Sequence, residues 1–332
     1  MKATEIKELF RRFRNLKVLI IGDSMIDAYM WGHIERMSPE APVPVVRIDR
    51  QEKKLGGAAN VARNIRRLGA YPILLSALGQ DEQARSFLDL MQKEHLNTEG
   101  LLELSDRPTT VKTRVINGKE HVLRVDEESQ EDIEDGDQVI QLLKNILDEH
   151  HIDVAIFQDY NKGLLRSDLI ERSIALLREK GIPMVVDPKK KNFFAYRGVD
   201  LFKPNFKEML EGMQVVVESS DDSAVLQTMK ELRSQLGAAA ILLTRSERGV
   251  AIIDESDGFL QDAFERNIVD VSGAGDSVIS VAALALAAGM DLRELATISN
   301  MAGGLACEEV GVHPISPERL SEELEKFYQL QE

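Results

Sequence analysis

The chain has 332 residues, of which 43% are hydrophobic and 29% are charged, the composition of an ordinary globular protein. Its formal net charge of −15 would repel nucleic-acid phosphates and anionic membranes, so we expect neither as a partner. No apolar run approaches the roughly 18 residues that a transmembrane helix needs. Cys307 is the single cysteine, which rules out an intrachain disulfide and favours a cytoplasmic protein.

After an amphipathic helix within residues 1–17, short apolar runs alternate with helical stretches along the chain. The predicted strands cover residues 17–23, 72–78, 153–159, 183–188, 200–205 and 239–246, and the helical stretches include 59–69, 137–150 and 167–181. Each run is continuously apolar, as in strands covered on both faces. The alternation therefore indicates an α/β fold with a mostly parallel central sheet and helices on both faces. Because no linker or repeat interrupts the chain, we expect one domain over residues 1–332.

Two segments do not follow this alternation. Residues 41–51 and 109–128 alternate apolar and polar side chains, and the second contains an Asn-Gly turn at 117–118. They predict a small, half-exposed sheet, which is either an ordinary edge hairpin or a lid over a cleft. A half-apolar exposed sheet also favours pairing with a second copy, so we expect a homodimer through it.

Polar residues follow several of the predicted strands. They are Asp23 with Asp27, Asp159, Asp187 with Lys189, Asn205 and Thr244. Ligands of open parallel sheets bind outside the carboxyl ends of the strands, so this pattern indicates a sizeable site for a polar ligand. Any one of these aspartates taken alone is equally consistent with a helix cap.

The sequence GAGD at residues 273–276 opens a long apolar helical run. Glycines let backbone N–H groups approach an anion, and a helix N-terminus favours negative charge. Gly273, Ala274 and Gly275 are therefore predicted to hold a phosphoryl group while Asp276 accepts a hydroxyl proton. The alternative is a flexible loop with Asp276 as a helix cap. Neither a P-loop nor a complete GxGxxG motif is present.

Five motifs occur in a fixed order: GDSMIDAY (22–29), GGAAN (56–60), DPK (187–189), KPN-x-x-E (203–208) and VDVSGAGDS (269–277). Together they strongly resemble the PfkB, or ribokinase-like, family of ATP-dependent sugar kinases, from about Val18 to the C-terminus. The resemblance implies the ribokinase-like fold, with lid segments at about 28–55 and 108–128. It also implies ATP and Mg²⁺ as cofactors.

Three further strings, RMSPEAPVPVV (36–46), QDYNKGLL (158–165) and LLTRSERG (242–249), are similar to one branch of that family. Its members phosphorylate the anomeric hydroxyl of D-glycero-D-manno-heptose 7-phosphate to the 1,7-bisphosphate in ADP-heptose synthesis. No HxGH-like motif follows, so we expect no fused nucleotidyltransferase domain and a separate enzyme downstream. A kinase for another sugar or nucleoside, or a non-catalytic binding regulator, are the alternatives. Ser272 and Ser277 stand where the family usually has threonine, and Gln158 replaces a small residue.

The resemblance also implies a role for individual residues. Asp276 would be the catalytic base and residues 273–275 the anion hole. The acceptor would contact Asp27, Gly56, Gly57, Asn60, Lys112, Arg114, Asp159, Lys162, Asp187 and Lys189. Asn205 and Glu208 would organise Mg²⁺ and phosphate through water, without a direct protein ligand set, and Thr244, Ser246, Gly249 and Asn300 would line the nucleotide. Arg124 is a further candidate for the sugar phosphate. Lys162 and Lys189 are the preferred phosphate ligands, with Lys190 and Lys191 at the surface.

Overall fold

The computed structural model describes residues 1–118 and 120–330, and its centre is a nine-stranded sheet. The sheet order is β13-β12-β11-β10-β9-β8-β1-β4-β5. Its strands are β1 (Lys17–Gly22), β4 (Tyr71–Gly79), β5 (Leu101–Leu104), β8 (Val154–Gln158), β9 (Met184–Asp187), β10 (Leu201–Phe202), β11 (Ala240–Thr244), β12 (Val250–Ile253) and β13 (Gly258–Gln261). All neighbours from β11 to β5 are parallel, and β12 and β13 add an antiparallel edge.

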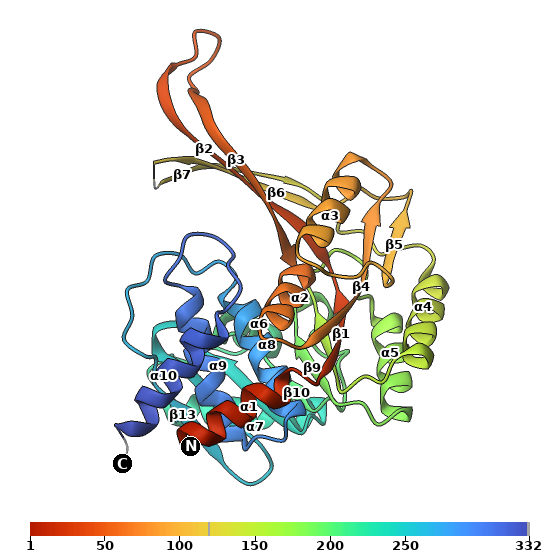
Figure 1. Ribbon diagram of the computed structural model, residues 1–332, viewed down its shortest axis with the longest axis vertical. Helices are drawn as coiled ribbons and strands as arrows, with labels where there is room; N and C mark the ends of the chain where they lie inside the picture. The colour runs from red at the N-terminus through yellow and green to blue at the C-terminus, as the bar shows by residue number, and fades with distance from the viewer. Residues whose placement is uncertain (119, 331–332) are drawn as a thin grey trace.

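Helices cover both faces of this sheet (Figure 1). One face carries α1 (Ala3–Phe13), α2 (Ala58–Arg67), α3 (Glu82–Lys93), α8 (Ala274–Ala287), α9 (Leu292–Ala306) and α10 (Pro317–Gln329). The other carries α4 (Gly136–Glu149), α5 (Ser167–Glu179), α6 (Phe206–Met213) and α7 (Asp222–Leu236). Within the described residues, no helix has the length and hydrophobicity that a membrane span requires.

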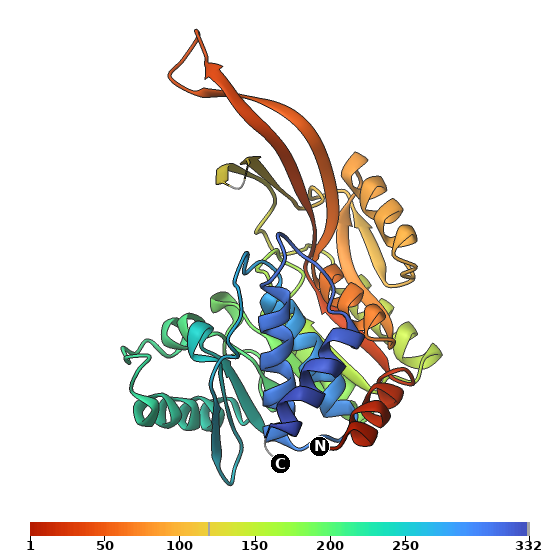
Figure 2. The same cartoon turned by 60° about the vertical axis from the view of Figure 1, so that its left-hand side comes forward.

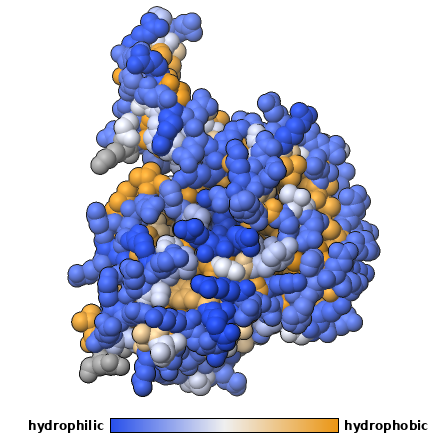
Figure 3. Space-filling model, in the orientation of Figure 1, coloured by the Kyte–Doolittle hydropathy of each residue, from blue (hydrophilic) through white to orange (hydrophobic). Residues whose placement is uncertain are grey.

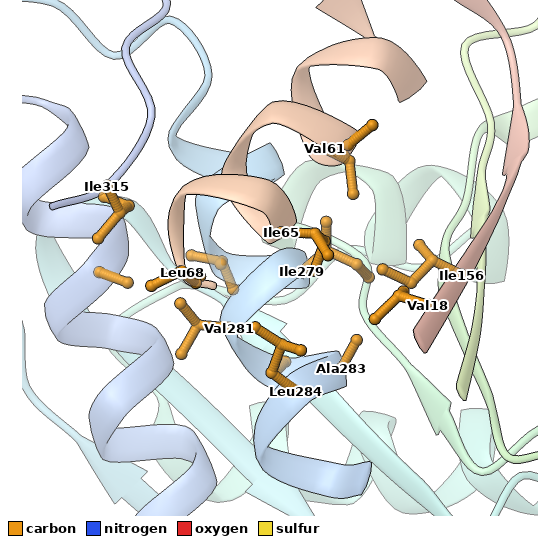
Figure 4. Packing of buried hydrophobic residues seen from close by; sticks show 14 of the residues in the cluster. Val18, Val61, Ile65, Leu68, Ile156, Ile279, Val281, Ala283, Leu284 and Ile315 are labelled. Carbon is orange, nitrogen blue, oxygen red and sulfur yellow. The ribbon is translucent and has the colours of Figure 1, made fainter. Parts of the chain in front are cut away.

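Alternate residues of each strand enter the two cores. Val18 and Ile20 of β1 pack in the first core, whereas Leu19 and Ile21 pack in the second. Figure 4 shows the first core, where Ile279 of α8 lies against α2 and β1. Burial on both faces explains the continuous apolar runs, and the predicted α/β fold is confirmed.

A second sheet has the order β3-β2-β6-β7 and is formed by β2 (Ser24–Met37), β3 (Pro44–Gly57), β6 (Val111–Asn117) and β7 (Glu120–Glu127). Two antiparallel hairpins, β2–β3 and β6–β7, meet through the parallel pair β2–β6. The long β2–β3 hairpin projects from the body as an arm (Figures 1 and 2). The two predicted accessory segments, 41–51 and 109–128, contribute β3 and the β6–β7 hairpin to this sheet, so the small sheet is confirmed. The residue pattern did not predict β2, because its first six residues are buried and only its distal part is exposed.

Candidate active site

The carboxyl ends of five neighbouring strands bring polar side chains to one edge of the sheet. These are Asp23 after β1, Gln158 at the end of β8, Asp187 at the end of β9, Lys203 after β10 and Thr244 at the end of β11. The chain passes from β1 to one side of the sheet and returns through β8 on the other. Such a reversal point is where open α/β sheets bind ligands.

The Asp276 side chain lies buried in the first turn of α8 above this edge. Its Oδ2 accepts a hydrogen bond from Asn60 Nδ2 at 2.7 Å, and its Oδ1 accepts from the Tyr160 hydroxyl at 2.8 Å and from Gln158 Nε2 at 3.2 Å. Burial raises the pKa of Asp276 to about 6, although the bonds from Asn60 and Tyr160 oppose the rise. The carboxylate is therefore ionised at neutral pH and close enough to its pKa to exchange a proton.

The glycines before Asp276 shape the entry to α8. Gly273 is the N-cap residue with φ of 79°, and a Cβ there would lie 3.2 Å from Asn60 Nδ2. The Ala274 N–H donates to Val271 O, and the Ser277 N–H donates to Gly273 O. Among the residues that the structure describes, the N–H groups of Gly275 and Asp276 have no partner within the chain. Two donors at a helix N-terminus are thus available to an anion.

A buried ion pair lies beside these N–H groups. Lys203 Nζ is 2.9 Å from Asp187 Oδ2, and a Cβ added to Gly275 would be 3.7 Å from that oxygen and 3.8 Å from the Lys203 nitrogen. Lys203 was not among the site residues predicted from the sequence. The available signal was a lysine immediately after a buried strand, inside the KPN motif. Tyr160, the donor to Asp276, was also not predicted, although it lies within QDYNKGLL at residues 158–165.

The expected hydroxyl-binding residues adjoin Asp276 on the other side. Asp27 lies within β2 rather than at a strand end, and Arg114 Nη1 donates to its Oδ1 at 2.5 Å. A Cβ on Gly56 would lie 2.2 Å from Asp27 Oδ2, so only glycine leaves room for that carboxylate. Gly57, with φ of 59°, turns the chain into α2, whose first turn presents Asn60 to Asp276.

Most of the cations considered for the acceptor phosphate are engaged by carboxylates. Lys112 and Lys162 share Glu128, and Lys189 pairs with Glu208. Arg124 pairs with Asp126 on an exposed strand, Lys191 pairs with Asp132, and Lys190 is exposed. Of these candidates, Lys112, Arg114, Lys162 and Lys189 lie beside the carboxyl-edge groups, as Lys203 does.

Asn205 and Glu208 form the capping box of α6. Asn205 Oδ1 accepts from the Glu208 N–H at 2.8 Å, and Glu208 Oε2 accepts from the Asn205 N–H at 2.9 Å. Because Lys189 binds its other oxygen, each carboxylate oxygen of Glu208 already has one hydrogen-bond partner. Asp159 is also occupied, since its oxygens accept from the Asn161 N–H and the Tyr196 hydroxyl. It forms no hydrogen bond with Asp276 within the part of the chain that the structure describes.

The residues expected along the nucleotide gather around the β11–β12 turn. Thr244 ends β11, and Ser246 has φ of 52° in the single 3₁₀ turn that follows. A Cβ on Gly249, whose φ is 72°, would lie 2.1 Å from Gln261 O and 2.5 Å from the Asp262 carbonyl carbon. Asn300 Nδ2 of α9 donates to Asp262 O at 2.8 Å. Gly249 and Asn300 thus both position the chain at residues 261–263.

Taken together, the edge offers a proton acceptor, two free N–H donors and a buried lysine within one small region. This set can deprotonate a hydroxyl and offset negative charge on a group transferred to it.

The profile of the pfkB family of carbohydrate kinases matches residues 15–319. A protein of Geobacter metallireducens described as "Bifunctional protein HldE" is 35% identical over 320 residues, covering 96% of this chain and 64% of that protein. Its counterpart in Gluconacetobacter diazotrophicus is 37% identical over 303 residues, covering 90% of this chain and 62% of that protein. The chain thus spans just under two thirds of these curated relatives.

Solved structures share the fold at low identity. Phosphofructokinase-2 from Escherichia coli, in complex with substrates and products, superposes with a TM-score of 0.78 at 18% identity, covering 95% of this chain and 99% of that one. Arabidopsis thaliana ribokinase complexed with ribose and ATP gives 0.72 at 15% identity, covering 93% and 99%. The ribokinase-like fold is therefore confirmed, including the separate small sheet.

Proposed function

This chain belongs to the pfkB family of carbohydrate kinases, phosphotransferases with an alcohol acceptor, and we propose that it phosphorylates the anomeric hydroxyl of D-glycero-D-manno-heptose 7-phosphate. The observation that carries the kinase chemistry is the buried Asp276 next to the free N–H groups of Gly275 and Asp276. The assignment to this branch of the family is supported by SPEAPVPV at residues 38–45 and by QDYNKGLL, which resemble the corresponding strings of the heptose phosphate kinases.

Asp276 acts as the general base in this proposal. With its pKa at about 6 it is ionised at neutral pH, and Asn60 and Tyr160 hold its oxygens in place. An anomeric hydroxyl is more acidic than an ordinary alcohol, so a carboxylate suffices to accept its proton. The acceptor's other hydroxyls would contact Asp27, Gly56, Gly57, Asn60 and Asp187. Asp159 would act indirectly, through the loop that it holds in place.

The phosphoryl donor would lie on the opposite side of the GAGD turn. When bound, Mg·ATP supplies the phosphoryl group. The free amides of Gly275 and Asp276 would hold it, and Lys203 would offset its charge. Thr244, Ser246, Gly249 and Asn300 would line the nucleotide. In the Asn205–Glu208 cap, each side-chain oxygen already accepts a hydrogen bond within the chain. The cap therefore fits a metal contact through water better than direct ligation.

The most direct test uses the purified chain with Mg·ATP and heptose 7-phosphate, followed by mass spectrometry of the product. A bisphosphate labile at the anomeric carbon is expected. Turnover of ribose, fructose or adenosine in place of the heptose phosphate would assign another acceptor within the family. Tight sugar binding without any transfer would instead indicate a non-catalytic regulator.

The small sheet is proposed as a lid that excludes water and as the contact between two copies. The β2–β6–β7 register puts Asp27 and Arg114 on one face, and Met30, Val115 and Leu123 on the opposite one. Exposed apolar residues gather on this sheet and its arm, namely Ile34, Met37, Val43, Leu123 and Val125. Figure 3 shows hydrophobic atoms among hydrophilic ones on the projecting arm. A dimer mass by light scattering at micromolar concentration is expected, and a monomer mass would contradict this contact.

A cytoplasmic location completes the proposal. The chain's acidic surface supports the absence of nucleic-acid and membrane partners.

A further inference from the structure

Glu128 lies between two lysines where the small sheet meets the body. One carboxylate oxygen is 2.6 Å from Lys112 Nζ, and the other is 2.8 Å from Lys162 Nζ. The three side chains are only 11–15% exposed. Burial raises the pKa of Glu128, but the two lysines outweigh it and lower the value to about 2. The carboxylate is therefore ionised and firmly held throughout the physiological pH range.

This cluster borders the candidate active site on two sides. Lys112 is directly opposite Asp27 in the β2–β6 register, so both side chains leave the same face of the sheet. The Lys162 N–H donates to Asp23 Oδ2, and Lys162 follows Tyr160, the donor to Asp276, by two residues. The Lys112 ammonium group is thus carried by the strand beside the acceptor site, and the Lys162 ammonium group by the loop that positions the base.

We propose that the Glu128 carboxylate occupies the binding position of the acceptor sugar's own phosphate, which displaces it from Lys112 and Lys162. This inference rests on the proposed function, because it assumes a phosphate-bearing acceptor. Lys112 also lies 3.1 Å from Asp126, whose charge is offset by Arg124, so the whole cluster carries one unit of positive charge. A phosphate in place of the Glu128 carboxylate carries close to two negative charges and neutralises the cluster. A sugar without phosphate has no group that competes with the carboxylate, so the two lysines select for phosphorylated acceptors and Glu128 moderates that preference.

The surrounding backbone allows this exchange without rearrangement. Arg107 Nη2 donates to Glu131 O at 3.1 Å and to Lys162 O at 2.6 Å, and the Ile133 N–H donates to Gly163 O at 3.1 Å. These bonds hold the segment after Glu128 against the Lys162 loop independently of the carboxylate. Rotation of the Glu128 side chain would free Lys162 and leave Lys112 with its 3.1 Å contact to Asp126, a carboxylate that Arg124 also binds. By contrast, Lys189 is bound to Glu208 of the α6 cap and Arg114 to Asp27.

Glu128→Gln removes the competing charge while keeping the size of the side chain. We expect the KM for the sugar phosphate to fall about fivefold, the scale of a partly exposed ion pair. For the same sugar without its phosphate, kcat/KM should not improve. Lys112→Met and Lys162→Met should each lower the ratio of kcat/KM for the phosphorylated over the free sugar at least about fivefold. Lys191→Met, which breaks a surface pair with Asp132, is the matched control and should leave this ratio unchanged.

Inorganic phosphate provides a readout that does not need turnover. Its stabilisation of the protein in a thermal melt should appear at about fivefold lower concentration in Glu128→Gln than in the wild type. A higher KM or a weaker phosphate effect in Glu128→Gln would overturn the displacement and make Glu128 an organiser of the lysines. A wild type that transfers phosphate to no acceptor would contradict the proposed function instead, and the melt would still decide whether Glu128 competes with phosphate.

Discussion

The hydroxyl of Tyr160 donates a 2.8 Å hydrogen bond to Asp276 and so ties the loop after β8 to the first turn of α8. This bond lowers the pKa of a carboxylate that burial raises to about 6. A base works only when deprotonated, so activity should fall as the pH drops through that value. Tyr160→Phe should move the acidic limb of the kcat/KM profile upward by about 1 pH unit. Tyr196→Phe, which loses a bond to Asp159 instead, should leave the limb in place.

Asp276→Asn tests the base itself. The amide cannot accept the hydroxyl proton, so we expect kcat to fall at least about 100-fold with little change in sugar affinity. Steady-state kinetics together with calorimetric binding of the acceptor separate the two effects. Turnover close to that of the wild type would remove Asp276 from this role.

The same variant should affect stability in the opposite direction. The pKa of Asp276 is higher in the folded chain than its ordinary value of 3.8, so ionisation above about pH 6 opposes folding. Asp276→Asn should therefore stabilise the fold by about 3 kcal/mol at pH 7.5, and this gain should vanish below about pH 4, where both states are protonated. Urea unfolding at the two pH values measures the difference, and an equal effect at both would disagree with the raised pKa.

Two neighbouring glycines should respond differently to alanine. A Cβ on Gly275 would meet Asp187 and Lys203 only at ordinary contact distances, so Gly275→Ala should fold normally. Its methyl group would still crowd the free N–H groups and lower kcat at least about tenfold. Gly273→Ala forces a φ of 79° on alanine and brings a methyl group to 3.1 Å from Val312, so the melting temperature should fall. Equal melting temperatures for the two variants would contradict this distinction.

Lys203 and Asp187 form a buried pair, and removing one partner leaves an isolated charge. Lys203→Met should lower the free energy of unfolding by about 3 kcal/mol. Adding Asp187→Asn to that variant should recover part of the loss, because the unpaired carboxylate is gone. A double-mutant cycle by chemical denaturation measures the coupling, and purely additive effects would count against a buried pair.

The sequence by itself determined the α/β class, because strands buried on both faces leave continuous apolar runs that separate them from the amphipathic helices. It also located Gly273–Asp276, since glycines at a helix start followed by a carboxylate are consecutive residues and can be recognised without knowledge of the fold. The strand positions of β1, β4, β8 and β11 were predicted to within two residues at each end.

Only the tertiary structure decided which distant groups meet there. Asn60 and Tyr160 bind Asp276 across separations of 216 and 116 residues, and Glu128 reaches Lys112 and Lys162 from a different strand and loop. Such contacts depend on strand order and register, which the local pattern of apolar residues does not encode. The pKa of Asp276 is set in the same way, because burial beneath other segments removes the water that would otherwise stabilise its charge.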